Sequence, residues 1–446
     1  MFKAAKGRFV FAVLFGTLLA VAAGAAIVPL SPAEGATVRE TVRVAVAGTD
    51  VPEGGFVVFN VDGEFRVAVG VPKDVSGGKK AYVFDWDTKL STVSPGQTGE
   101  PTQVADGRHE IEVAVHDSTG ALRDSGTVSV RVANKIPTTT PPSPTRLAYK
   151  FFIGQQLQYD VIAKVELLDI EGRPMLDDPV ILTSASQVTV SVEDMMPGSA
   201  LVRYKWQPMV SIQYLGQPYP EAVYVPTPAY RYVSTGGKVT EAGFGGRSKA
   251  QLFDLFVETP GGPARPGDSW TASDVLNVPG VLRGAKVDLK SLFDSLEWES
   301  GHECAKIRTT LSSRFGLTII KDRLELPESD MAGTGTAFFA YKTGKLMSVE
   351  YVLAAQTNVD STILDSLRSG QGGDIGNLVL PGAGGGPFEG SPEGGGYRGE
   401  APGPTYPGQT SGPPGGYYGP NAARAQTPVA ETPVKFRITV KVELKK

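Results

Sequence analysis

Four residues of this chain have side chains that commonly bind transition metals or act as nucleophile and base: three histidines and one cysteine. His302 and Cys304 are two positions apart, so they share one face if the segment is extended. Such a pair could ligate a metal or form a Cys-His dyad, but a structural zinc site takes four ligands and a catalytic one takes three. We therefore expect a buried thiol beside an exposed histidine, with neither a metal nor another cofactor. His109 and His116 are seven positions apart on a predicted strand, which places them on opposite faces and argues against a metal pair.

The carboxylates give no catalytic pattern. Glycoside hydrolysis needs two carboxylates that flank a cleft, and these usually come from distant parts of a sequence. The close acidic groups here adjoin turn-forming residues and are interpreted as turns: they are Asp85/Asp87, Asp169/Glu171, Asp177/Asp178 and Glu325/Glu328/Asp330. The sequence also contains no Gly-x-Ser-x-Gly elbow, EF-hand or P-loop. We assign no catalytic, cofactor-binding or metal-binding residue.

The best binding candidate is an aromatic stretch that is interrupted by prolines, residues 214–232. Proline cannot occupy a central strand, so the segment should lie at an edge or on the surface. Exposed tyrosine rings there could stack on sugars or on another protein, whereas an edge strand would instead turn the rings into the core. The five candidate ligand-binding residues are Tyr214, Tyr219, Tyr224, Tyr230 and Tyr232.

Composition excludes several classes of protein. The formal net charge is −4, and basic residues do not form long runs, so a nucleic-acid partner is not expected. The single cysteine excludes a disulfide framework within the chain. Gly and Pro are abundant, with 54 and 34 copies, and they concentrate between Pro381 and Pro428, where no packed core can form. The remainder is typical of a globular protein.

The amino terminus has the pattern of an export signal. Lys3, Lys6 and Arg8 precede an apolar stretch that ends in Ala23-Gly24-Ala25, a small-x-small cleavage pattern. We predict a signal peptide over residues 1–25. The alternative is an uncleaved anchor over residues 9–28, which is long enough to span a bilayer and would be the chain's link to a membrane. Either reading predicts an exported protein, secreted or retained in the cell envelope.

Residues 29–134 alternate short strand patterns with turns. Val42, Val44 and Val46 share one face of a predicted strand, and Asp62-Gly63 between two apolar runs indicates a hairpin. Two later strands repeat the alternation at His109–His116 and Thr127–Val132. About seven strands in such a length are typical of an immunoglobulin-like sandwich, with Trp86 expected in its core.

Four pieces of this segment resemble the bacterial Ig-like modules of secreted glycoside hydrolases and surface proteins. They are LSPAEGATVRETVRVAVAG, VVFNVDGE, YVFDWDT and DGRHEIEVAVHDSTGALRDSGTVSVRV. The resemblance covers about a quarter of the chain and implies a spacer, adhesion or accessory module without catalysis. A Pro/Thr linker, residues 135–146, follows it.

A larger β-rich domain is predicted over residues 147–369 plus 433–446. Leu157–Leu167 alternates apolar and polar residues, and further strands are expected within 188–214, 305–312 and 336–355. Apolar spacing near 3.6 predicts short helices at Ser248–Glu258 and Ala285–Glu297. The turns around Gly154 and Tyr232 are echoed roughly 110 residues later, which indicates two related halves.

The last residues form a very regular strand pattern. Val434, Phe436, Ile438, Val440 and Val442 alternate with polar residues, and such a face must pair within a sheet. We therefore interpret 370–432 as a long disordered Gly/Pro/Tyr-rich insertion between two strands of one domain, with Leu346–Ala355 as a partner of the terminal strand.

The predicted fold is thus mainly β: an N-terminal Ig-like sandwich and a larger antiparallel β domain with a few short helices. The leading functional hypothesis is a non-enzymatic exported protein with a binding or structural role, whose partner is cell-wall polysaccharide or another envelope protein. The alternatives are a polysaccharide-active enzyme with an Ig-like accessory module, and a carrier of an apolar ligand in the β-rich domain.

Overall fold

The computed structural model describes most of the chain, in two compact units. The described residues are 27, 29–75, 77–89, 104–206, 209–218, 223–224, 228–241, 255–278, 282–315, 318–319, 324–325, 329–368 and 431–445. Unit 1 comprises Met1–Pro137 with Glu297–His302, and unit 2 comprises Thr138–Leu296 with Glu303–Lys446. The chain is mainly β, as predicted. The predicted signal peptide lies outside the described residues, and so does the predicted insertion at 370–432 except for residues 431 and 432, which belong to the strand β26 (Glu431–Leu444).

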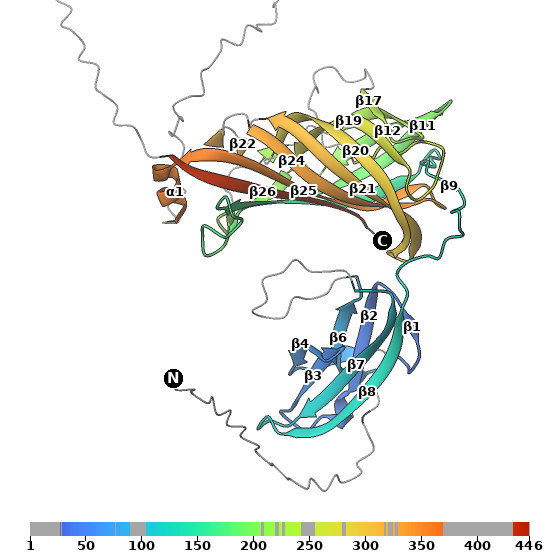
Figure 1. Cartoon of the computed structure of the whole chain (residues 1–446), viewed down its shortest axis with the longest axis vertical. Helices are drawn as coiled ribbons and strands as arrows, with labels where there is room; N and C mark the ends of the chain where they lie inside the picture. The colour runs from blue at the N-terminus through green and yellow to red at the C-terminus, as the bar shows by residue number, and fades with distance from the viewer. Residues whose placement is uncertain are drawn as a thin grey trace, which may run out of the picture. The chain divides into compact units, whose positions relative to one another are not determined.

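Unit 1 contains two sheets around one core (Figure 1). The larger has the order β1 (Thr37–Val38), β8 (Leu122–Val132), β7 (Gly107–His116), β3 (Phe56–Val61), β4 (Glu64–Val69). The smaller has the order β2 (Thr41–Ala47), β6 (Lys79–Asp87), β5 (Lys73–Val75), and a short 3-10 turn, η1 (Gly48–Asp50), follows β2. Alternate residues of both sheets are buried together, and Trp86 is part of this core as expected. The predicted hairpin turn is also confirmed, because Asp62 and Gly63 both have positive φ, 54° and 77°.

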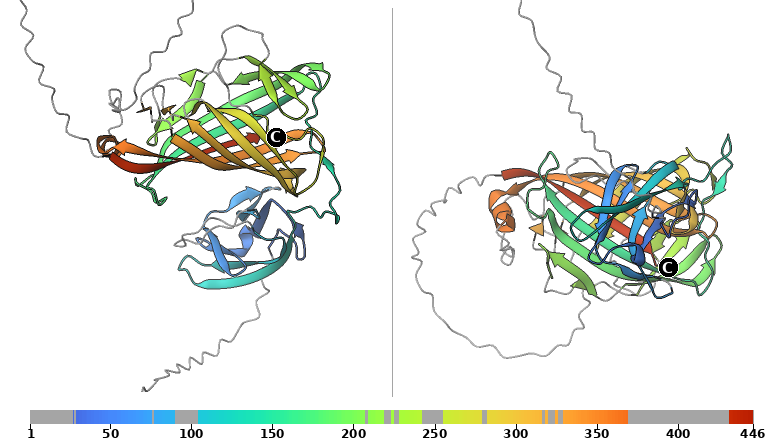
Figure 2. Two further views of the ribbon diagram at one scale, coloured as in Figure 1. Left: turned by 45° about the horizontal axis from the view of Figure 1, so that its top comes forward. Right: turned by 90° about the horizontal axis from the view of Figure 1, so that it is seen from below.

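Unit 2 is built on one large antiparallel sheet that curves back on itself (Figures 1 and 2). Its strand order is β17 (Val239–Glu241), β16 (Ala229–Ser234), β12 (Ser199–Trp206), β11 (Val180–Met196), β10 (Gln156–Leu168), β26 (Glu431–Leu444), β25 (Lys345–Asp360), β24 (Ser329–Ala340), β21 (His302–Phe315), β20 (Leu282–Glu299), β19 (Ser269–Val278). Most neighbours in this order are also successive along the chain. The insertion of β26 between β10 and β25 is the main exception.

Short strands accompany the large sheet. β13 (Met209–Tyr214) pairs with the first half of β11, and with β14 (Gln217–Pro218) and β15 (Val223–Tyr224). β9 (Thr145–Arg146) pairs with β18 (Pro263–Ala264), and β22 (Thr318–Ile319) pairs with β23 (Leu324–Glu325). One helix, α1 (Ser361–Arg368), extends β25 and was not predicted.

The terminal strand occupies the position that its sequence predicts. Its alternate residues from Val434 to Val442 are buried, and Val440 lies opposite Tyr351 of β25 and Ala163 of β10. The expected pairing with the 346–355 strand is therefore confirmed. Because β26 is bonded on both sides, it is an interior strand of the sheet.

The helix predicted at Ala285–Glu297 is wrong, since these residues belong to the long strand β20. Val287, Leu289 and Phe293 are buried at a period of two, and the buried residue between them is polar: Ser291, whose Oγ is 2.9 Å from Thr309 Oγ1 of β21. That serine interrupted the apolar alternation, while the exposed Leu292 supplied a false helical spacing. The helix predicted at Ser248–Glu258 is also not present in its described part: Leu255–Glu258 has no regular secondary structure, and 248–254 lies outside the described residues.

Aromatic side chains join the two halves of the curved sheet across its interior. Tyr204 of β12 contacts Phe256, Phe256 contacts Tyr149, and Tyr149 contacts Phe339 of β24, with ring centroids 6.2, 5.0 and 4.9 Å apart. Tyr149 and Phe256 belong to two connecting segments, so these segments pack into the space between the facing halves. This packing fixes the position of the residues that follow Phe256.

Candidate binding site

The tyrosine candidates whose side chains the structure describes, Tyr214, Tyr230 and Tyr232, do not form a single platform. Tyr230 and Tyr232 lie on the same side of β16, half-buried, with Ala229 and Val233 on the opposite, buried side. Tyr214 lies at the end of β13, opposite Leu182 of β11. Tyr232 is level with Asp194 of β11. At about 3.3 Å per residue, these two points are about 40 Å apart along β11. Burial raises the pKa of the Tyr214 hydroxyl to about 12. Tyr219 lies outside the described residues, as does the side chain of Tyr224.

The histidines and the cysteine have ordinary structural contacts. His109 lies 2.7 Å from Asp62 Oδ2 through Nδ1, and His116 stacks on Phe56. Cys304 is buried against Ala340 and Met347, while His302 is exposed, as predicted. Within the described ranges, no three His, Cys, Asp or Glu side chains are grouped in a way that could hold a metal ion.

Only part of the interpretation of acidic groups as turns is correct. Asp169 does organise a turn, since its carboxylate accepts hydrogen bonds from the backbone N–H groups of Arg173 and Glu171. These bonds, the one from Arg173 above all, hold the pKa of Asp169 below the ordinary value. Asp85 and Asp87 instead lie within β6, and Asp330 lies within β24 opposite Arg314. In those cases the turn-forming residues that suggested a turn lie in the loops next to the strands, and the carboxylates lie in the strands themselves.

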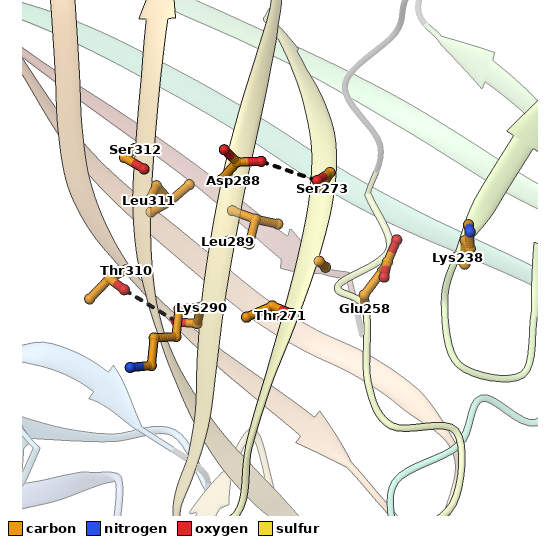
Figure 3. A pocket seen from close by; sticks show the side chains of 11 residues that line it. Lys238, Glu258, Thr271, Ser273, Asp288, Leu289, Lys290, Thr310, Leu311 and Ser312 are labelled. Carbon is orange, nitrogen blue, oxygen red and sulfur yellow. Dashed lines mark hydrogen bonds between the residues drawn. The ribbon is translucent and has the colours of Figure 1, made fainter.

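A pocket of about 820 Å³ lies over β19, β20 and β21, and we call it the β19–β21 pocket (Figure 3). Each of these strands contributes three successive residues, and two further residues come from other segments. The complete lining is Lys238, Glu258, Thr271, Ala272, Ser273, Asp288, Leu289, Lys290, Thr310, Leu311 and Ser312. Figure 3 shows Lys238 and Glu258 on the other side of β19 from β20 and β21. The pocket thus brings together β19 at one end of the strand order and Lys238, next to β17, at the other end.

Antiparallel register explains how the three strands place their polar groups side by side. Ser273 is paired with Asp288, and Thr271 with Lys290. Ser273 Oγ donates a hydrogen bond to Asp288 Oδ1 at 3.1 Å, and Thr310 Oγ1 donates to the Lys290 carbonyl oxygen at 3.4 Å. The alternating positions Leu289 and Leu311 belong to the buried face. Hydroxyl and charged groups therefore recur at every second residue.

Glu258 is held in place by its neighbours. The indole Nε1–H of Trp270 donates to the Glu258 carbonyl oxygen at 2.9 Å, and Thr259 Oγ1 donates to the Leu147 carbonyl oxygen at 2.9 Å. Burial raises the pKa of the Glu258 carboxyl, and the positive charge of Lys238 acts in the opposite direction. Glu258 is thus a carboxyl group with reduced solvation at the border of the pocket.

The pocket offers hydrogen-bonding groups of every kind. Its lining residues carry two carboxyl groups, two ammonium groups and four hydroxyl groups; the other three are aliphatic, and of these Leu289 and Leu311 belong to the buried face. Carboxylates accept hydrogen bonds, ammonium groups donate them and hydroxyl groups do both. Sequence reasoning missed this site, because its residues come from five separate segments and three of them, Asp288, Leu289 and Lys290, were assigned to a helix. No local motif could have identified it.

A second, adjoining groove of about 840 Å³ continues across β21, β24, β25 and β26. It shares Asp288 and Ser312 with the β19–β21 pocket. Asp330, Gln356 and Lys435 lie further along it, and Gln356 is paired with Lys435. The two pockets therefore adjoin at Asp288 and Ser312.

The comparisons with known proteins give no match: none was found among family models, curated proteins or solved structures. Among the described residues, no helix has both the length and the apolar character needed to cross a membrane.

Proposed function

We propose that this chain is an exported binding protein whose unit 2 holds a polyhydroxylated ligand of the saccharide class in the β19–β21 pocket. The observation that carries the proposal is the lining of that pocket, in which eight of eleven residues are hydroxylic or charged. The volume of about 820 Å³ lies in the range of small-molecule sites, which is roughly 300–1,000 Å³. A cell-wall polysaccharide is the partner that best combines this chemistry with export.

The arrangement of the polar groups supports a sugar more than an apolar molecule. Ser273 and Asp288 present a hydroxyl and a carboxylate 3.1 Å apart, a spacing that suits neighbouring hydroxyl groups of a sugar ring. Lys238 and Lys290 add donors that reach ring oxygens or carboxylate substituents. By contrast, an apolar ligand carried between the two halves of the sheet would compete with Tyr149 and Phe256, which pack there.

Unit 1 fits the role of an Ig-like spacer or accessory module within this proposal. Its two sheets enclose one core, its residues 29–134 carry the resemblance to Ig-like modules of secreted enzymes and surface proteins, and a Pro/Thr linker follows. In unit 2, the strands from β10 to β17 and those from β19 to β25 follow the same direction along the sheet order, which fits two related halves. The leader-like amino terminus supports a location in the envelope or outside the cell.

A second candidate function is hydrolysis of a glycosidic bond. The observation that favours it is the presence of two carboxyl groups in one pocket with different surroundings: burial raises the pKa of Glu258, whereas Asp288 accepts a hydrogen bond from Ser273. Glycosidases use such a pair, in which a protonated carboxyl donates to the leaving oxygen and an ionised one assists water or attacks the sugar. Ligand binding requires only the polar lining of the pocket, so we rank binding ahead of hydrolysis.

A glycan array probed with the full chain tests the first proposal. The wild-type protein should bind a restricted set of glycans, and Ser273→Ala/Asp288→Asn should lose them. The matched control is Tyr230→Phe/Tyr232→Phe, which alters hydroxyl groups on β16 outside the pocket and should leave binding intact. If the tyrosine variant abolishes binding and the pocket variant does not, the ligand site is on the tyrosine strand and the proposal is wrong.

Incubation with the bound glycans separates the two functions. Binding without release of reducing ends supports the first candidate. Turnover that Glu258→Gln and Asp288→Asn each abolish, measured at glycan concentrations high enough to saturate each variant, would establish the second. Turnover that survives in both variants would exclude the pocket as a catalytic site.

A further inference from the structure

Four surface turns meet at one end of unit 2, and they expose an apolar cluster. The Gly154 N–H donates to the Val192 carbonyl oxygen, and the Val192 N–H donates to the Gln155 carbonyl oxygen, both at 2.9 Å. These bonds tie the turn before β10 to the base of the β11–β12 hairpin. The Thr235 N–H donates to the Gly198 carbonyl oxygen at 3.0 Å, and the Lys150 N–H to the Gly344 carbonyl oxygen at 3.2 Å. Two further turns, 234–238 and 341–344, are thereby joined to the same end.

The first two turns carry large apolar side chains that face solvent. Phe152 and Ile153 are 59% and 65% exposed, and Met195 and Met196 are each 39% exposed. They are four of the seven exposed large apolar residues found in the described part of unit 2. The other three, Ile162, Ile170 and Leu292, lie further along the strands and not at this end. Clustered exposed apolar side chains at loop tips mark an interaction surface.

Charge distinguishes this end from the opposite one. The four turns carry Lys150, Lys238, Lys342 and Lys345 against two carboxylates, Glu193 and Asp194. Glu193 is paired with Arg203, and Lys342 is paired with Glu303 of β21 at 2.7 Å. At the far end of β10 and β11, the turn at 169–179 also exposes an isoleucine, Ile170, at 53%. That turn, however, has four carboxylates and a single arginine. The four turns at one end and the 169–179 turn at the other therefore differ in the sign of their charge.

We propose that the basic end of unit 2, with Phe152, Ile153, Met195 and Met196 at its tips, docks onto an anionic lipid surface. Aromatic and aliphatic side chains would enter the boundary between headgroups and acyl chains, while the lysines contact acidic headgroups. A protein partner would not require both features together, whereas a lipid surface requires apolar tips within a ring of positive charge. This contact is separate from the predicted signal segment, and it uses none of the residues of the β19–β21 pocket other than Lys238.

Local fluorescence on the full chain tests the proposal, because membrane binding through the amino-terminal segment alone would not distinguish two labels at opposite ends of unit 2. Ile153→Cys and Ile170→Cys are each coupled to an environment-sensitive dye, and the native Cys304 is buried and should remain unlabelled. Vesicles of phosphatidylglycerol and phosphatidylcholine should shift the emission at position 153 to the blue and leave position 170 unchanged. Equal shifts at both positions, or a shift at neither, would overturn the proposal.

Vesicle titration with substituted chains gives the second measurement. Phe152→Ser/Ile153→Ser should weaken the response of a dye placed at position 195 by at least about tenfold, whereas Ile170→Ser should not change it. Lys150→Glu/Lys342→Glu should weaken binding of the chain to anionic vesicles. Added salt should reduce the difference in vesicle affinity between this variant and the wild type. Unchanged thermal unfolding of each variant shows that it is folded, and undiminished binding by the folded serine variant would contradict the inserted tips.

Discussion

The hydroxyl group of Tyr149 makes two hydrogen bonds with a single residue, Val257. It donates to the Val257 carbonyl oxygen at 3.1 Å and accepts from the Val257 N–H at 3.0 Å, across 108 positions of sequence. Both groups are buried, and burial raises the pKa of the Tyr149 hydroxyl well above its ordinary value. The hydroxyl therefore fixes the segment that continues to Glu258. The border of the candidate site depends on a residue that lies outside it.

Replacing Tyr149 with phenylalanine should destabilise unit 2 by about 1–3 kcal/mol, since the buried N–H and C=O of Val257 would lose this partner. Chemical denaturation followed by near-UV circular dichroism measures the change. Tyr232→Phe, on the half-buried side of β16, is the matched control and should alter the free energy of unfolding by less than about 0.5 kcal/mol. Equal stabilities of the two variants would show that the Tyr149 hydroxyl does not anchor the segment.

Gly237 contacts the same pair of residues. Its φ is +84°, and a Cβ atom there would lie 2.6 Å from Tyr149 Cε2 and 2.6 Å from the Val257 carbonyl oxygen. Gly237→Ala should therefore cost more than Gly216→Ala, where φ is +74° but nothing lies within 4 Å of the added atom. The expected difference is about 1–3 kcal/mol, the usual cost of overpacking, and thermal unfolding measures it. Similar melting temperatures for the two variants would mean that backbone strain alone acts at both sites.

Asp117 should make the stability of unit 1 depend on pH. Hydrogen bonds to its carboxylate from Thr119, Ala121 and Arg123, the Thr119 side chain being the strongest, hold its pKa well below the ordinary value of 3.8. A carboxyl with a lowered folded-state pKa stabilises the fold above the unfolded-state value, and this contribution disappears as the pH falls below about 4.

Melting curves from neutral to acidic pH test this dependence. Asp117→Asn should lower the melting temperature of unit 1 near neutral pH and make its decline in acid shallower than in the wild type. Asp124→Asn, on the same hairpin, should retain the wild-type slope. Parallel acid declines for the wild type and Asp117→Asn would show that this carboxyl does not contribute.

Deletion of Val434–Lys446 should abolish cooperative unfolding of unit 2, because β26 is bonded to β10 on one side and to β25 on the other. Replacing residues 381–428 with a short Gly/Ser linker should instead leave the melting temperature nearly unchanged, since closure entropy varies only logarithmically with loop length. Differential scanning calorimetry distinguishes the two cases. A truncated chain with the wild-type transition would contradict the interior placement of β26.

Strand alternation predicted the framework well, and particular residues explain where it failed. Val434 to Val442 alternate without a break, so both the strand and its partner could be predicted. In β20, the buried Ser291 is satisfied by Thr309 of the next strand, a contact that cannot be read from local sequence. The candidate site depends on register between β19 and β20, such as Ser273 opposite Asp288, and on a connecting segment positioned by Tyr149. Long-range pairings of this kind leave no local pattern.

The most direct test of the proposed function is calorimetric titration of the full chain with the glycan selected by the array. Asp288→Asn should weaken binding at least about tenfold, because a carboxylate acceptor contributes about 1.5–3 kcal/mol to a hydrogen bond with a sugar hydroxyl. The control is Asp330→Asn, which changes a carboxylate of the adjoining groove outside the β19–β21 pocket and should bind a short glycan with wild-type affinity. Wild-type affinity in Asp288→Asn, together with lost binding in Asp330→Asn, would contradict the assignment of the β19–β21 pocket as the ligand site.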